Sequence, residues 1–402
     1  MKKGRNMIRG KEIKILTVVG LALVLVVSLV AGACAPAAPP GEEAAEEIAE
    51  LEEEIADLED EVAAEKTKTK DLEKEIAALK KPAEVHKWRP STWLSAGIIW
   101  DDLMYIADII TEGSDGRIVV TPTAPGAICP VEEQVDNVAA GLANAMDMWP
   151  GYYPGKVPLG GVEGGDMLPG FAEMAQLRDF WENYENGRIT ELFREDYAEF
   201  GDIFWVGAHY WECPNMINSK VPIPDAAALE GIKFRSSEGI ARALTIMGAS
   251  TIWTPGPEIY TTLATGVVDA VTFSHAYDTM SMGFMEVTDY LITWPTMCYH
   301  VTNCFVVNGT EWDSLTPDLQ TLVFAAVNAA SWRGCNEFVV LNEMAIKSAV
   351  DDYGIILQAW PAEDGPKYVA AMGEVLEEEK ERSPRVAEFI DLYFQYLEEY
   401  GL

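Results

Sequence analysis

The stretch "LEGIKFRSSEGIARAL", residues Leu229 to Leu244, decides the fold because it joins a strand pattern to a helix pattern. Ile232 and Phe234 alternate with polar neighbours, which predicts a short buried strand. The strand pattern ends in Arg235, two serines follow, and the apolar spacing then becomes helical. A full cation at the end of a core strand, next to the start of a helix, needs a chemical reason.

The alternation of strand and helix patterns continues on both sides of this stretch. Helical spacing over 95–116 is followed by a β-branched strand pattern at 117–123 and a helix pattern over 130–141. After Leu244, strand patterns at 250–255 and 267–273 flank a helix pattern. This order predicts α/β layers with largely parallel strands. From Thr316 onward the chain is expected to be mostly helical.

The composition excludes several classes of function. The chain has 402 residues and a net charge of −36, which argues against a nucleic-acid partner because a phosphate backbone needs a basic surface. Its six cysteines have no C-x-x-C spacing and its four histidines are scattered, so most cysteines are expected to be small buried hydrophobes. Without a G-x-S-x-G motif, a P-loop or a metal-ligand cluster, we predict neither an enzyme nor a cofactor.

The first 41 residues have the pattern of an export signal and a tether. A basic segment precedes the apolar run 15–33, and small residues then lead to Cys34. We interpret 1–33 as a lipoprotein signal peptide, Cys34 as the lipidated residue and 34–41 as a flexible tether. A retained transmembrane helix is the alternative, since the apolar run is just long enough to span a bilayer. Both interpretations place the rest of the chain outside the cytoplasm.

Residues 42–81 have the heptad pattern of a coiled coil. Apolar residues recur at alternating spacings of three and four from Ile48 to Val62 and again from Leu72 to Leu79. β-Branched residues at one core position and Leu at the other favour a parallel dimer. We therefore predict a coiled-coil stalk that forms a homodimer, with a solvated single helix as the alternative.

The position of Arg235 suggests a binding role. Ligands of open α/β sheets bind beyond the carboxyl ends of the strands. Ser236 or Ser237 can cap the following helix, whose free N–H groups add partial positive charge. A guanidinium at this point can pair with a ligand's carboxylate through two hydrogen bonds. An ion pair with an internal Asp or Glu is the structural alternative.

The segment from Leu229 to Tyr290 resembles the DctP-like extracytoplasmic solute receptors of TRAP transporters. The likeness rests on "LEGIKFRSSEGIARALTIMGA" and on "PGPEIYTTLATGVVDAV", in which Pro255, Glu258 and Asp269 match the family pattern. The resemblance implies a two-lobed, periplasmic-binding-protein-like α/β fold with a hinge, which closes on a small organic acid. It also implies that Arg235 binds the ligand's carboxylate.

The expected domains are a first lobe over about 84–211 with parts of the C-terminal helices, and a second lobe over about 212–305. Strand ends, aromatic loops and, for Trp211, the expected hinge region supply the remaining ligand-binding candidates. These are Trp93, Trp149, Tyr152, Tyr153, Trp211, Thr272, Phe273, Ser274 and Tyr277. Thr272 stands in a stretch where the 2-oxoacid-binding branch of the family carries a metal-binding glutamate, so no metal is predicted here.

These expectations combine into a membrane-anchored solute receptor. It would capture a small organic acid outside the cytoplasm and deliver it to the membrane subunits of a TRAP permease. An extracytoplasmic sensory or scaffolding receptor with the same cleft is the first alternative, and a cell-surface enzyme is the second.

Overall fold

The computed structural model describes residues 42–79, 85–171, 173–212, 216–294 and 300–402. The chain divides into two units between Ala83 and Glu84. In the first unit, the described residues form one helix, α2 (Glu42–Leu79). The predicted helix is thus confirmed, whereas its pairing into a coiled coil stays a prediction. The leader, the tether and Cys34 lie outside the described residues. None of the described helices is long and apolar enough to cross a membrane.

The second unit begins with the sheets of a first lobe. Their strands are β1 (His86–Trp88), β2 (Ile118–Val120), β3 (Ala145–Met148), β4 (Ile203–Glu212) and β10 (His300–Asn308). β1 and β2 pair in parallel, whereas β10 lies between β3 and β4 and is antiparallel to both. A hydrogen bond from the Asp147 N–H to the Ser91 carbonyl links the two sheets.

The second lobe contains a mixed six-stranded sheet in the order β11-β9-β5-β8-β6-β7. Its strands are β5 (Ile217–Ser219), β6 (Lys233–Arg235), β7 (Ser250–Ile252), β8 (Ala270–Thr272), β9 (Tyr290–Trp294) and β11 (Ile356–Ala359). β6 is parallel to both β7 and β8, while β5 is antiparallel to its two neighbours. The strand predicted to end at Arg235 therefore lies inside this sheet.

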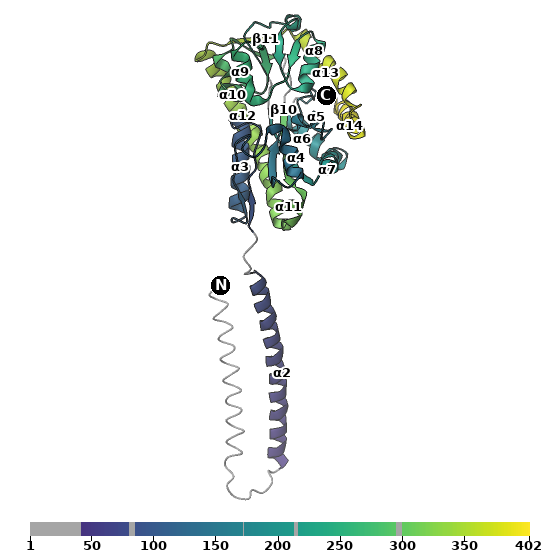
Figure 1. Cartoon of the computed structure of the whole chain (residues 1–402). Helices are drawn as coiled ribbons and strands as arrows, with labels where there is room; N and C mark the ends of the chain where they lie inside the picture. Colours follow the sequence, from purple (N-terminus) through teal and green to yellow (C-terminus); the bar gives the residue numbers. More distant parts are fainter. Residues whose placement is uncertain (1–41, 80–84, 172, 213–215, 295–299) are drawn as a thin grey trace. The chain divides into compact units, whose positions relative to one another are not determined.

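Helices cover both lobes and connect them (Figure 1). They are α3 (Gly97–Gly113), α4 (Gln134–Ala139), α5 (Gly160–Glu163), α6 (Met174–Glu182), α7 (Arg188–Phe200), α8 (Glu238–Ile246), α9 (Ile259–Ala264), α10 (Ala276–Ser281), α11 (Gly309–Ser314), α12 (Pro317–Asp351), α13 (Gly365–Glu379) and α14 (Pro384–Tyr400). The long helix α12 packs against β4 and α3 of the first lobe and against α10 of the second. It begins at Pro317 after Thr316, as the sequence predicts.

The expectation of largely parallel strands is wrong for half of the strand pairs. Each strand next to β10 or β5 is antiparallel to it. All nine residues of β10 are buried, so its sequence carries no alternation that would reveal the pairing. β10 pairs with β3 and β4, so residues 300–305 lie in the sheet of the first lobe rather than in the expected second lobe.

An aromatic cluster holds α6 against α14 in the main core. Phe180 is fully buried, and its ring centroid lies 5.3–6.1 Å from those of Phe171, Phe389, Tyr393 and Tyr396. The contacts with Phe389 and Tyr393 are edge-to-face, and such contacts add to the free energy gained by burying the rings. The cluster therefore fixes the C-terminal helix on the segment that follows α5.

We expect Phe180→Ala to lower the free energy of unfolding by about 3–5 kcal/mol, because it leaves a cavity among rigid rings. Urea unfolding followed by circular dichroism measures this change. Leu142→Ala is the control, since Leu142 is 75 % exposed and should change stability little. Equal stability of the two variants would contradict this description of the core.

Candidate functional site

A cavity lies between the two lobes, at the carboxyl ends of β6 and β8. It has about 450 Å³ of space between its lining atoms, part of it open to solvent at the mouth. The first lobe contributes an aromatic wall and the second lobe contributes the strand ends. The lining residues are Trp93, Trp149, Tyr152, Asp166, Arg235, Ser237, Thr272, Phe273, Ser274 and Val301.

Arg235 lies in this cavity and is 3 % exposed. Its Nε and Nη2 donate to the Thr254 carbonyl at 2.9 and 2.7 Å, and its Nη1 donates to the Thr272 carbonyl at 3.3 Å. The guanidinium carbon also lies 5.4 Å from the ring centroid of Phe273. Within the described part of the chain, no Asp or Glu forms an ion pair with it. The partners of this buried cation are thus carbonyl dipoles and an aromatic face.

Burial changes the pKa of the Arg235 side chain. Loss of solvent lowers the pKa of its guanidinium to about 10, against the smaller opposing effects of Tyr152 and Asp166. The group remains charged at neutral pH, but its charge is poorly compensated. Such a site favours an anion that can enter the cavity and accept hydrogen bonds from the guanidinium.

Aromatic rings from both lobes meet across the cavity. The Trp93 ring of the first lobe lies 5.7 Å from that of Phe273 in the second, in an edge-to-face arrangement. Trp149 and Tyr152 lie 6.2 and 6.0 Å from Trp93, so the three form a continuous wall. Trp93 and Trp149 are each less than 10 % exposed. These rings supply the apolar surface that most small-molecule sites use to exclude water.

Two of the sequence candidates whose side chains are described, Tyr153 and Tyr277, do not line the cavity. Tyr153 is 1 % exposed, and its hydroxyl lies 2.6 Å from the Val131 carbonyl and 2.9 Å from Gln134 Oε1. Its neighbour Tyr152 therefore faces the cavity while Tyr153 belongs to the core. Tyr277 packs against Phe338 and His275. Trp211 belongs to β4, but its side chain lies outside the described part of the structure.

The structure adds Asp166, which the sequence did not single out. Asp166 is 5 % exposed and accepts a 2.6 Å hydrogen bond from Ser237 Oγ. Burial raises the pKa of its carboxyl to about 6, while the hydrogen bond from Ser237 opposes the shift. Its only sequence signal is that one acid stands in a run of glycine and apolar residues, "GGDMLPG". Such a signal points to no particular structural position.

A buried polar chain supports the aromatic wall from behind. Trp93 Nε1 donates to Asn303 Oδ1 at 3.0 Å, and the Asn303 amide donates to both carboxylate oxygens of Asp147 at 3.2 Å. Asp147 Oδ1 lies 2.6 Å from His209 Nε2, and Asp102 lies 3.6 Å from the other ring nitrogen. A continuous chain of hydrogen bonds therefore connects the cavity wall to His209.

We expect His209 to remain an imidazolium at pH 8. Burial alone would lower its pKa, but the charges and hydrogen bonds of Asp147 and Asp102 raise the pKa to about 10. Because the pKa of His209 is higher in the folded state than in the unfolded chain, the charged histidine stabilises the folded state. This contribution is complete below about pH 6.5 and is lost as the pH approaches 10. ¹⁵N NMR of histidine-labelled protein measures the protonation state, and His209→Gln assigns the signal. An imidazole signal that titrates near pH 6.5 would contradict the proposed charge.

The described residues do not form a metal site in this cavity. No group of three or more His, Cys, Asp or Glu comes together among them. Of the described lining residues only Asp166 carries a carboxylate, and Ser237 already binds it. The residues therefore do not fit the hard-cation sites that gather several oxygen ligands. The absence of a metal stays a prediction.

Comparison with known proteins agrees with the fold. Residues 93–382 match the model of the DctP family, the bacterial extracellular solute-binding proteins of family 7. The chain belongs to this family. It is 26 % identical over 268 residues to the monocarboxylate 2-oxoacid-binding periplasmic protein of Nostoc, covering 65 % of this chain and 70 % of that protein.

Solved structures of TRAP solute-binding proteins share the two-lobed α/β fold. A protein from Bordetella bronchiseptica, with calcium and picolinate in one of its sites, has a TM-score of 0.71 at 21 % identity. A protein from Pseudoalteromonas atlantica with bound sodium and pyruvate has a TM-score of 0.69, also at 21 % identity. Each match covers 79 % of this chain, with 93 % and 95 % of the other chain respectively.

Proposed function

We propose that this chain is a solute receptor that captures a small organic acid between its lobes and delivers it to a TRAP permease. The observation that carries the proposal is the buried Arg235 guanidinium, which lines the cavity and donates only to backbone carbonyls of the described residues. A ligand's carboxylate supplies the missing negative charge. The alternative of an internal ion pair loses its support, because no described acid pairs with Arg235.

Both lobes contribute to the proposed binding step. Arg235 and Thr272 come from the second lobe, whereas Trp93 and Tyr152 come from the first. A ligand that contacts both sets of side chains stabilises the closed arrangement of the lobes, and its departure favours opening. Opening at the permease would release the solute without any chemical reaction. Binding without turnover agrees with the solute-binding role of the related proteins.

The Nostoc relative supports a monocarboxylate as the ligand class. That protein is named for binding monocarboxylate 2-oxoacids. The present cavity contains a single basic residue among its described lining residues, Arg235, which suffices for one carboxylate. The inference concerns the carboxylate alone, and the rest of the ligand depends on the other polar groups of the cavity.

We expect Arg235→Ala to weaken carboxylate binding at least 30-fold. Loss of one member of a buried, hydrogen-bonded charge pair costs about 2–5 kcal/mol. Isothermal titration calorimetry against a panel of small organic acids measures the affinity. Arg117→Ala is the matched control, since Arg117 pairs with Asp318 away from the cavity. Equal affinity of Arg235→Ala and the wild type would contradict the carboxylate role of Arg235.

We further propose that a lipid on Cys34 anchors the receptor and that residues 42–81 hold two copies together. The heptad seam is the support for the dimer, since isolated helices depend on packing for stability.

Replacing Ile55 and Leu58 by Lys should convert dimers to monomers, because two charges would enter the seam. Sedimentation equilibrium measures the mass, with Glu54→Lys and Asp57→Lys as the control pair. A wild-type monomer at all concentrations would contradict the dimer.

A further inference from the structure

We propose that the ligand is a monocarboxylate that also carries a hydroxyl or ammonium donor, and that Asp166 accepts a hydrogen bond from this donor. The inference rests on the proposed function and names its substrate class. It makes Asp166 a specificity-determining residue next to the carboxylate position at Arg235. It also predicts discrimination against dicarboxylates and against acids that lack a donor.

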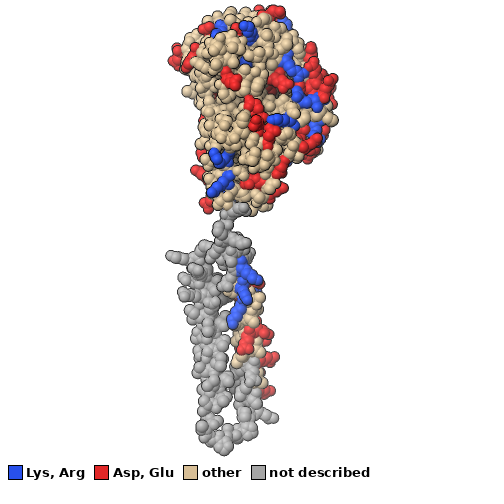
Figure 2. Space-filling model, viewed as in Figure 1, with Lys and Arg blue, Asp and Glu red and all other residues tan. Residues whose placement is uncertain are grey.

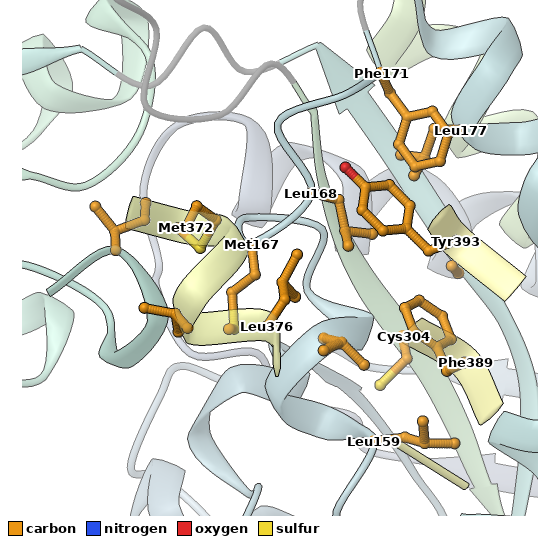
Figure 3. Packing of buried hydrophobic residues seen from close by; sticks show 14 of the residues in the cluster. Leu159, Met167, Leu168, Phe171, Leu177, Cys304, Met372, Leu376, Phe389 and Tyr393 are labelled. Carbon is orange, nitrogen blue, oxygen red and sulfur yellow. The ribbon is translucent and has the colours of Figure 1, made fainter. Parts of the chain in front are cut away.

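The backbone around Asp166 holds its carboxylate in place. Gly165 precedes it with a φ of +76°, and a Cβ at Gly165 would lie 3.0 Å from the His300 carbonyl oxygen, so the turn depends on glycine. The next residues point into the main core: Met167 lies near Leu376 on α13, and Phe171 lies beside Tyr393 (Figure 3). With its chain fixed on both sides, Asp166 cannot easily withdraw from the cavity.

One oxygen of the carboxylate retains capacity to accept hydrogen bonds. Ser237 Oγ donates to Oδ2 at 2.6 Å, and the backbone N–H of Asp166 itself also acts on the carboxylate; no other described residue donates to Oδ1. A carboxylate has about four acceptor positions. At neutral pH the group is mostly ionised, given a pKa of about 6. A charge that is 5 % exposed gains most from a donor brought in by the ligand.

The charge balance of the cavity disfavours a second carboxylate on the ligand. Arg235 compensates the first carboxylate, and no other described lining residue is basic. Arg382 lines an adjoining hollow, but its guanidinium donates to Glu379 and Glu238. A dicarboxylate would therefore place an unpaired negative charge near Asp166, where both groups are poorly solvated. A 2-oxo oxygen accepts hydrogen bonds but cannot donate one. It would therefore face the Asp166 carboxylate, which is also an acceptor, without forming a hydrogen bond.

A purely structural role makes a different prediction. Asp166 belongs to the first lobe, whereas Ser237 begins helix α8 of the second. Their hydrogen bond joins the lobes and would favour closure with any ligand. If closure were the whole role, removing the carboxylate would weaken all ligands by the same factor. If Asp166 determines specificity, the loss of affinity on removing its carboxylate should depend on whether the ligand carries a hydrogen-bond donor. This dependence separates the two roles.

Calorimetry of the full chain with matched acids tests the proposal. The panel pairs each parent acid with its 2-hydroxy, 2-amino and 2-oxo derivatives, for example propionate with lactate, alanine and pyruvate, and adds succinate. For the wild type we expect at least one donor-bearing acid to bind tenfold or more tighter than its parent and its 2-oxo derivative. Asp166→Asn should reduce that preference at least tenfold and leave the parent acid within threefold.

One control variant makes the outcome specific. Ser237→Ala removes the hydrogen bond between the lobes but keeps the carboxylate, so the preference for a donor should persist. If the preference is absent in the wild type, or if Asp166→Asn weakens all acids equally, the inference is overturned while the proposed function stands. If no carboxylate binds, or if binding survives Arg235→Ala, the proposed function fails together with it.

Discussion

The desolvated guanidinium of Arg235 is the constraint on which the site depends. Its three hydrogen bonds to the carbonyls of Thr254 and Thr272 fix the plane of the guanidinium at the ends of β6 and β8. Neutral carbonyls orient a cation without cancelling its charge. The protein therefore keeps a buried cation beside an aromatic wall, and no described acid forms an ion pair that would cancel its charge.

The architecture around this cation explains why two lobes are needed. β6 and β8 present Arg235 and Thr272 at one edge of the second sheet, but this edge alone would be open to water. The first lobe supplies Trp93, which is held by Asn303 and the Asp147–His209 pair behind it. The aromatic contact between Trp93 and Phe273 then closes the cavity across the two lobes. The helix α12 packs against β4 and α3 of the first lobe and against α10 of the second, and so connects the two sides of the cavity.

Much of this arrangement could be predicted from the sequence, and the failures have physical causes. The sequence pattern of a short buried strand followed by a helix predicted that Arg235 lies at a strand end. The strand pattern after Asp269 predicted the same for Thr272 and Phe273. Periodicity could not decide between Tyr152 and Tyr153, because they lie at the end of a single short 3-10 turn, Pro150–Tyr152, which is too short to show a repeat in the sequence. The antiparallel strand β10 was missed because burial on both faces removes its pattern. Asp166 was missed because it lies in a loop whose position depends on contacts distant in the sequence, with α8 and α13.

The acidity of the whole chain is compatible with an anionic ligand, because exposed charges are screened by salt over short distances whereas the buried charge of Arg235 acts on the ligand directly. The formal net charge is −36, and Figure 2 shows Asp and Glu interspersed with Lys and Arg on the visible face. At physiological ionic strength the fields of exposed charges decay over about 8 Å, so most surface acids have little effect inside the cavity. Arg235 acts there at short range and with poor screening. We therefore propose that Arg235 and Asp166, which both line the cavity without forming an ion pair, select the anion that binds, and that the exposed acids have little part in this selection.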